Sequence, residues 1–380
     1  MNSTTRRNWM KHSAAGGLGL GFVGPGTALA AASKQELKIT RTEAVKVHIP
    51  YVEHLRENIL EGYRKENLPP NHLLRWVVKI YTDAALVGVG EAVLDPRPHL
   101  PRLPGRSVWE LVHDVSIGPA ATIAVYDLAA QAAGLPVSRL FSASPRPTIQ
   151  QIWWSRSLSP KMMQTEAKRG VEAGYMVLKF KARPYEDLVD QVAAMVEVVP
   201  PDYQIFVDAN ASFVSVEKTL ALAQALRKYP QVKGFEEPIP HEDTVGYRHL
   251  HANLPIRLAV HWGAVDTRTF ILESLNDAFV VEDWLWGLPL MQKSALCALS
   301  GQKLWVENGL YSGISQAFQA HMAAAFPNIE FTISVTHISE DDLVIEPFVV
   351  EKGGFYKVPT KPGLGVTLDE KAVEKYRVAS

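Results

Sequence analysis

The sequence predicts an α/β fold, in which a parallel (β/α) barrel follows a smaller α+β domain. Short apolar segments alternate with helical patterns from Thr148 onward. A charged residue closes most of these segments at steps of about 21 to 28 residues, the length of one strand plus one crossover helix. The chain before Thr148 follows a different pattern, with strand-like alternation and a single helix.

The expected barrel alternates strands with helices from residue 148 to residue 335. Strands are expected at 148–154, 176–181, 203–208, 232–236, 257–261, 278–282, 303–307 and 330–335. Helices are expected at 160–173, 185–199, 215–228, 242–252, 266–275, 288–299 and 313–325. Groups at the carboxyl ends of such strands share one mouth, so the charged residues there are expected to meet.

The remaining chain is assigned by composition. Residues 38–141 are predicted to form the α+β domain, 148–335 the barrel, and 336–380 a loop-rich segment that returns to the first domain. Residues 1–31 are expected to be an export signal and are left out of the fold.

The leader contains Arg6-Arg7, a glycine-rich weakly apolar stretch and the small residues Ala28-Leu29-Ala30. This pattern is similar to a twin-arginine signal, which predicts an exported, periplasmic protein cleaved near Ala30. A disordered basic tail is the alternative. The apolar stretch is short for a membrane span, and no other segment reads as one, so no stable membrane insertion is expected.

Composition excludes some classes of function. The formal net charge of −1 argues against a nucleic-acid partner, because such surfaces are usually strongly basic. Cys297 is the only cysteine, so neither an intramolecular disulfide framework nor a cysteine-based zinc site is expected.

Several motifs occur in a fixed order between about residues 38 and 370. They are Gly90-Glu91, Ala124-Val125-Tyr126-Asp127-Leu128, Leu178-Lys179-Phe180-Lys181, Val207-Asp208-Ala209-Asn210, Phe235-Glu236-Glu237-Pro238 and Pro362-Gly363-Leu364-Gly365-Val366. At these residues the sequence resembles the enolase superfamily, in its mandelate racemase/muconate lactonizing enzyme branch. The resemblance implies a modified (β/α)8-type (TIM-like) barrel with an N-terminal α+β capping domain. It also implies abstraction of a proton α to a carboxylate, with a divalent metal holding the enediolate.

Lys179 and Lys181 are two residues apart on a strand, so their side chains share one face. Repulsion between two ammonium groups and burial in a barrel mouth would both lower a lysine pKa. The resemblance makes Lys181 the general base and Lys179 a partner that binds the substrate carboxylate or tunes the base. Two surface lysines are the alternative.

The resemblance implies that Asp208 and Glu236 are metal ligands, and hard carboxylate oxygens suit Mg²⁺. His261 stands at the strand end where the family usually has an acidic ligand. As a third ligand it would favour Mn²⁺ or another divalent metal more than a carboxylate does. His261 could instead contact substrate or be a buried structural residue. Glu237 is expected to face the helices.

A second departure concerns the group opposite the lysines. Racemizing relatives place here either a lysine or a His-Asp pair. In this chain Glu282 stands where the lysine would be and Glu307 where the histidine would be, while Asp277 could match the aspartate. A glutamate can act as an acid or base if burial raises its pKa. Each of the two glutamates could also be a hydrogen-bonded rim residue, and Asp283 could be the inward residue in place of Glu282.

The substrate side of the site is expected to include Tyr51, Trp153 and Asn210. Tyr51 lies in the stretch that forms a specificity loop in relatives. Trp153 and Trp154 end the first barrel strand, and one of the two is expected to line the pocket. Ordinary packing is the alternative for Tyr51 and Trp153.

These features predict a metal-dependent enzyme, a dehydratase-type lyase acting on a hydroxy or sugar acid. A racemase, epimerase or cycloisomerase of the same superfamily is the alternative, because Glu307 or Asp277 could act on the opposite face. An exported protein that binds carboxylates without catalysis is the second alternative. The expected partners are a small-molecule carboxylate and further copies of the chain in a homo-oligomer.

Overall fold

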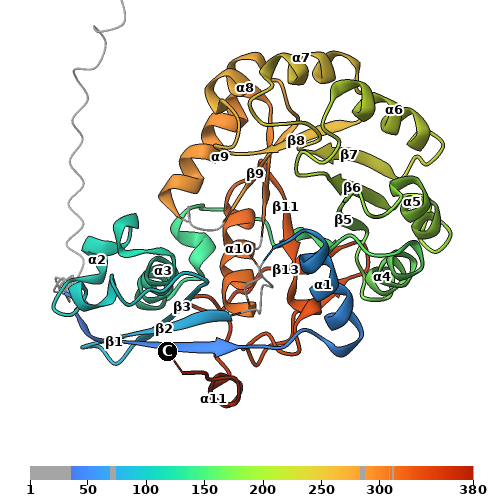
Figure 1. Cartoon of the computed structure of the whole chain (residues 1–380). Coiled ribbons are helices and arrows are strands. Elements are labelled where there is room, and N and C mark those ends of the chain that lie inside the picture. The colour runs from blue at the N-terminus through green and yellow to red at the C-terminus, as the bar shows by residue number, and fades with distance from the viewer. Residues whose placement is uncertain (1–35, 69–73, 283–286, 308, 310–311, 380) are drawn as a thin grey trace, which may run out of the picture. The chain divides into compact units, whose positions relative to one another are not determined.

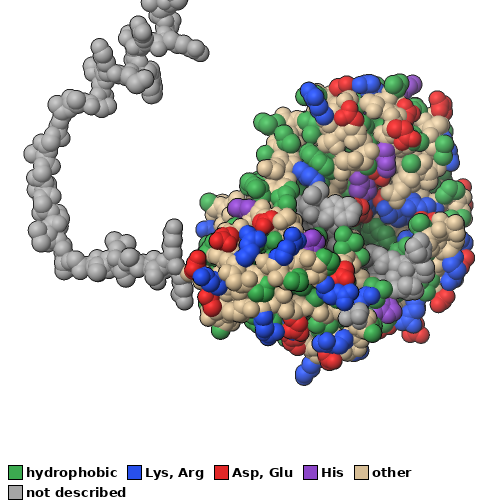
Figure 2. Space-filling view, turned by 60° about the vertical axis from the view of Figure 1, so that its left-hand side comes forward, with side chains coloured by type: hydrophobic (Ala, Val, Ile, Leu, Met, Phe, Trp, Pro, Cys, Tyr) green, Lys and Arg blue, Asp and Glu red, His purple; other side chains and the backbone are tan. Residues whose placement is uncertain are grey.

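The chain divides into two units, Met1–Gln35 and Glu36–Ser380. The computed structural model describes residues 36–68, 74–282, 287–307, 309 and 312–379. The expected export signal at 1–31 lies outside the described residues. Lys, Arg, Asp and Glu side chains are interspersed over the face shown in Figure 2, as the near-zero net charge suggests.

The second unit is built around a closed barrel of parallel strands (Figure 1). Its strands are β4 (Thr148–Ser155), β5 (Val177–Lys181), β6 (Gln204–Asp208), β7 (Val232–Glu236), β8 (Arg257–His261), β9 (Ala278–Val281), β10 (Lys303–Val306) and β11 (Ile329–Ser334). Each strand pairs with the next in sequence order, and β11 pairs with β4 to close the ring. This arrangement confirms the predicted barrel.

Helices join successive barrel strands and cover the outside of the ring. They are α4 (Pro160–Glu172), α5 (Leu188–Val196), α6 (Val216–Leu226), α7 (Thr244–Asn253), α8 (Thr267–Glu273), α9 (Leu288–Ser300) and α10 (Gly313–Ala325). Several begin at a side chain that accepts a hydrogen bond from a free backbone N–H of the first turn, which stabilises a helix start. Asp187, Ser215 and Asp243 serve α5, α6 and α7 in this way.

The capping domain is an antiparallel sheet of β1 (Ile39–His48), β2 (Leu74–Thr82) and β3 (Val87–Ala92), with α3 (Pro119–Ala133) packed on it. A Cβ at Gly90 would lie 1.9 Å from the carbonyl oxygen of Ala120. Glycine at this position therefore allows the helix to lie directly on β3. Helix α1 (Glu53–Lys65) joins β1 to β2, and the short helix α2 (Val108–Leu111) precedes α3.

The segment after β11 contacts both parts. Strand β13 (Phe355–Lys357) pairs with β4 and with β12 (Val350–Glu351). The backbone N–H of Leu364 donates to the Asp127 carboxylate on α3 at 2.8 Å. Beyond α11 (Glu370–Lys375), the N–H of Val378 donates to the carbonyl of Lys46 on β1 at 3.0 Å. The chain end thereby joins the capping sheet.

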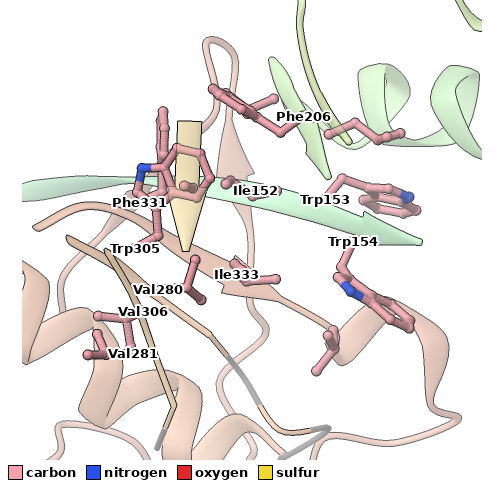
Figure 3. Packing of buried hydrophobic residues seen from close by; sticks show 14 of the residues in the cluster. Ile152, Trp153, Trp154, Phe206, Val280, Val281, Trp305, Val306, Phe331 and Ile333 are labelled. Atoms are coloured by element: carbon pink, nitrogen blue, oxygen red, sulfur yellow. The ribbon is translucent and has the colours of Figure 1, made fainter. Parts of the chain in front are cut away.

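Aromatic side chains fill the interior of the barrel below its mouth. Figure 3 shows Phe206, Trp305 and Phe331 gathered between the strands. The rings of Phe206 and Trp305 meet edge to face, with centroids 4.7 Å apart, and the Trp305 Nε1–H donates to Glu330 at 2.9 Å. Side chains two apart on a strand share a face. Trp305 therefore lies beneath Glu307, at the carboxyl end of β10, and supports it.

None of the helices within the described ranges combines the length and apolar character that crossing a lipid bilayer requires.

Trp305→Ala is expected to destabilise the protein by about 3 to 5 kcal/mol, because it leaves a cavity in the fully buried aromatic layer. Urea unfolding followed by tryptophan fluorescence or circular dichroism measures the change. Trp109→Ala is the matched control, since Trp109 on α2 is 48% exposed and should cost about 1 kcal/mol or less. Equal losses in the two variants would contradict the packing described here.

Candidate active site

The strand register places three charged residues side by side at the barrel mouth. Lys181 is the Cα partner of Asp208, and Asp208 is the partner of Glu236. Glu236 is aligned with Ala259 on β8, and His261 follows two residues later on the same face. The predicted site residues on these four strands therefore meet at the carboxyl ends.

Lys179 is the buried centre of this cluster. Its ammonium lies 2.7 Å from Glu236, 3.2 Å from Glu307 and 3.3 Å from Asp208, and its side chain has no exposed surface. Lys181 donates to Asp208 at 2.5 Å, and 15% of its side chain is exposed. Lys181 therefore reaches the open mouth, whereas Lys179 lies beneath it.

The expected lowering of the two lysine pKa values is wrong for the arrangement seen here. Burial lowers the pKa of Lys179, but the charges of Glu236, Glu307 and Asp208 outweigh it and hold the pKa well above its usual value. Burial also lowers the pKa of Lys181, and Asp208 with Glu307 again raises it overall. The two ammonium groups repel each other, but the carboxylates that surround them attract each one more strongly.

The carboxylates respond in different directions. Burial raises the pKa of Asp208, but Lys181 and Lys179 outweigh this effect and hold it below its usual value. Glu307 is likewise held well below its usual pKa, against burial, by the same two lysines. Burial, followed by the charge of Asp208, raises the pKa of Glu236. The negative charge of Glu236 is therefore the least favoured in the cluster, and a further cation beside it would stabilise that charge.

His261 lies between two carboxylates. Its Nδ1 is 2.9 Å from Glu237 Oε1, and its Nε2 is 2.9 Å from Glu307 Oε2. Burial lowers the pKa of this imidazole, but the hydrogen bonds to Glu237 and Glu307 outweigh burial and raise the pKa well above its usual value. A carboxylate faces each ring nitrogen, and the two hold the ring in one orientation.

Glu237 is a site residue that the sequence argument excluded. Strict alternation along β7 would point it at the helices, but its backbone has a φ of +45°, in the left-handed region. The strand has ended at Glu236, and this turn brings the Glu237 carboxylate to His261. The adjacent acids in Glu236-Glu237-Pro238 were a signal that two carboxylates could be needed here.

Glu237 connects the cluster to the capping domain. Its Oε2 accepts from Asn210 Nδ2 at 3.2 Å, and Asn210 Oδ1 accepts from Arg183 at 2.8 Å. Arg183 Nε donates in turn to Glu66, just after α1, at 2.9 Å. Asn210, expected to bind substrate, uses its side-chain amide in this chain of hydrogen bonds. Asn210 supports Glu237 in this arrangement, and a contact of Asn210 with substrate stays a prediction.

The cluster contains donors that fit a divalent cation. Glu236, His261 and Glu307 each offer a ligand atom, and these atoms lie within 4.8 Å of one another. Glu236 Oε1 is buried and lacks a hydrogen-bond partner among the described residues. A buried carboxylate oxygen without a partner is costly unless a cation contacts it. Two of the predicted ligands, Glu236 and His261, therefore belong to a set that also includes Glu307, whereas Asp208 lies beside Glu236 in register and stays a predicted ligand.

The two predicted acids on either side of β9, Asp277 and Glu282, lie at opposite ends of the barrel. Asp277 lies at the amino-terminal end of β9, where its carboxylate accepts from the N–H of Leu258 at 2.7 Å. This is the opposite end of the barrel from the lysines, so the expectation that Asp277 acts there is corrected. Glu282, at the carboxyl end of β9, is 44% exposed and lies 3.9 Å from His261 Nε2. It is a rim residue of the cluster.

Trp153 does not line the mouth, which corrects the predicted substrate contact. It packs outside the strands, where its ring stacks on His337 with centroids 3.5 Å apart. Trp154 is aligned with Lys179 and therefore shares its inward face. Figure 3 shows the two indole rings on opposite sides of β4. The sequence left open which tryptophan lines the pocket. The alternation of side chains along β4 turns Trp154, and not Trp153, into the barrel.

Tyr51 lies just before α1, and its side chain is buried in the hydrophobic core that includes Tyr63. Burial, with Tyr63 beside it, raises the pKa of its phenol. A contact of Tyr51 with substrate stays a prediction.

Comparison with known families agrees with this geometry. A family model described as enolase C-terminal domain-like matches residues 162–372, more than half of the chain. The chain belongs to the enolase superfamily. The match confirms the resemblance given by the lysine, Asp-Ala-Asn and Glu-Glu-Pro motifs, and it places the chain in a superfamily of enzymes.

Relatives within the superfamily differ in reaction. D-gluconate dehydratase of Thermoproteus tenax is 25% identical over 280 residues, which are 68% of this chain and 55% of that enzyme. o-Succinylbenzoate synthase of Geobacillus stearothermophilus is 27% identical over 265 residues, 67% of this chain and 68% of the enzyme. The solved structure of N-succinyl Arg/Lys racemase from Bacillus cereus has a TM-score of 0.74 at 20% identity and covers 90% of this chain and 98% of its own. This last likeness concerns the fold.

Glu237→Gln is expected to lower the pKa of His261 by about one unit or more, because a hydrogen-bonded carboxylate favours the charged imidazole. Titration of the His261 ring by NMR in the metal-free protein measures the change. Glu273→Gln is the control, since Glu273 is an exposed carboxylate on α8 that pairs with Arg248 at 2.6 Å. A His261 titration that is the same in both variants would remove Glu237 from the site.

Proposed function

We propose that this enzyme removes a proton α to a carboxylate, using Lys181 as the base, in a divalent-metal-dependent reaction that passes through an enediolate. The observation that carries the proposal is the position of Lys181. Its amine is the part of the lysine pair that reaches the mouth, and it lies 2.5 Å from the carboxylate of Asp208, the Cα partner of Glu236. A small-molecule carboxylate is the proposed substrate, and Mg²⁺ or Mn²⁺ is the proposed metal.

The role proposed for each residue follows from how deeply its side chain is buried. Lys179 is fully buried among three carboxylates, so it holds their charges in place and does not contact the reacting carbon. Asp208 and Glu236, with His261 or Glu307, would hold the cation. That cation, when bound, supplies positive charge where the enediolate oxygens develop negative charge. Lys181 must shed its proton before it can accept one, so its pairing with Asp208 has to loosen when substrate is present.

A dehydratase-type lyase acting on a hydroxy or sugar acid is the proposed reaction. Loss of water needs one base and one acid for the leaving hydroxyl group, whereas inversion needs a base on each face. Lys181 is the lysine that reaches the mouth. His261, between two carboxylates, would be the acid if Glu307 and not His261 is the third metal ligand. The similarity to a D-gluconate dehydratase supports the same reading.

A racemase or epimerase is the second candidate because of Glu307, which lies at the mouth 3.2 Å from Lys179 and 2.9 Å from His261. If Glu307 exchanges a proton with the face opposite Lys181, the stereocentre inverts. A cycloisomerase would use the same lysine and cation. Export by the twin-arginine route and assembly into a homo-oligomer are further proposals that rest on the sequence.

The enzyme is expected to exchange the α-proton of its substrate with deuterium in D₂O, and Lys181→Met is expected to slow the exchange by about a hundredfold or more. NMR or mass spectrometry of hydroxy and sugar acids incubated with protein and Mg²⁺ measures the exchange. Recovery of the inverted acid identifies a racemase, and a 2-keto product identifies a dehydratase.

Lys303→Met is the control, because Lys303 is exposed at the amino-terminal end of β10 and should leave exchange unchanged. Exchange that persists in Lys181→Met would contradict the assignment of the base. A folded, metal-loaded wild-type protein that exchanges no acid of either class would contradict the proposed reaction.

Glu236→Gln is expected to weaken Mn²⁺ binding at least about tenfold, because it replaces a charged ligand by a neutral one. Titration calorimetry or electron paramagnetic resonance of free Mn²⁺ measures the affinity. His261→Asn tests the third ligand in the same experiment. Affinity that does not change in Glu236→Gln would remove that carboxylate from the metal site, and affinity that does not change in His261→Asn would leave Glu307 as the third ligand.

A further inference from the structure

A pocket opens beside the cluster of charged residues, between the carboxyl ends of β7, β8 and β9. It has a volume of about 440 Å³, within the range of pockets that bind small molecules. His261 belongs both to the cluster and to the wall of this pocket. A molecule that occupies the pocket therefore lies next to the proposed reaction centre.

Lys293 on α9 is the unusual residue of this wall. The buried face of the helix consists of Leu290, Lys293, Ser294 and Cys297. These positions follow the spacing of an apolar stripe, on which a lysine is unexpected. Only 8% of Lys293 is exposed, so the side chain points at the barrel and not at solvent.

Among the residues that the structure describes, the Lys293 ammonium has no compensating anion. Its Nζ is buried and has no hydrogen-bond partner among the described residues. Its nearest recorded attraction is the ring of Trp262, with the nitrogen 5.1 Å from the centroid. Burial lowers the pKa of this lysine to about 8. A buried ammonium without an anion is costly, and such groups are usually paired.

The acids of the same pocket are already occupied. Glu237 accepts from Asn210, from the backbone and side chain of His261, and lies 2.9 Å from His241 Nε2. Glu282 is at the half-exposed rim, nearest to His261. Neither lies within ion-pair distance of Lys293 in the part of the chain that the structure describes. The charge left without a partner in this pocket is therefore positive.

We propose that Lys293 binds an anionic group at the end of the substrate distal to the reacting carboxylate, so that the preferred substrate is a dicarboxylic acid. The inference rests on the proposed function for the reacting end of the molecule. The distal carboxylate displaces water from the pocket, accepts hydrogen bonds from the ammonium and supplies the missing counter-charge. The Trp262 ring, 5.1 Å from the ammonium nitrogen, also favours its positive charge.

The test compares the binding of matched acids that the enzyme cannot turn over. Titration calorimetry, with and without Mg²⁺, measures the affinities of succinate, glutarate and adipate against butanoate, pentanoate and hexanoate. The wild-type protein is expected to bind the diacid that fits about tenfold or more tightly than the monoacid of equal length. Lys293→Met is expected to abolish this difference and to leave the monoacid affinity unchanged.

Lys293→Met keeps the length of the side chain and removes a buried charge, so its melting temperature should equal or exceed that of the wild type. Lys303→Met is the control and should keep the preference for diacids. A wild-type protein without that preference, or a Lys293→Met variant that retains it, overturns the inference. Binding is measured without turnover, so absence of α-proton exchange would refute the proposed function and leave this result standing.

Discussion

The site depends on one constraint, the in-register pairing of parallel strands around a closed ring. Lys181, Asp208 and Glu236 are successive Cα partners on β5, β6 and β7, and alternation places Lys179 on the same face one layer lower. The ammonium of Lys179 then stands among three carboxylates. Removal of any one partner would leave a buried charge uncompensated, so this group of charges is maintained as a unit.

The capping domain is coupled to this group through hydrogen bonds. Glu66, Arg183, Asn210 and Glu237 form a continuous path from the end of α1 to His261. Asn210 and Glu237 both have positive φ angles, at 42° and 45°. Non-glycine residues adopt this region at a cost and often do so at functional sites. The backbone after β7 thus brings Glu237 to the imidazole, and the backbone after β6 brings Asn210 to Glu237.

The barrel and most of the cluster could be predicted from the sequence, because both follow from the regular alternation of strand and helix patterns along the chain. An apolar segment predicts a buried strand, and the charged residue after it, Lys181, Asp208 or Glu236, marks the carboxyl end of that strand. Glu237 was missed because a left-handed turn breaks the alternation that assigned it outward. Asp277 was misplaced because it was assigned by resemblance to an aspartate of racemizing relatives, although it precedes the expected strand at 278–282 and so lies at the amino-terminal end of β9. The pKa directions of the lysines needed distances to acids on three other strands.

A crystal structure with Mn²⁺ and a bound substrate-like carboxylate tests the central claim most directly. The anomalous signal of manganese should lie about 2.1 Å from oxygens of Asp208 and Glu236, with the Lys181 amine facing the carbon next to the carboxylate. Manganese bound away from those carboxylates, with the acid outside the mouth, would contradict the account.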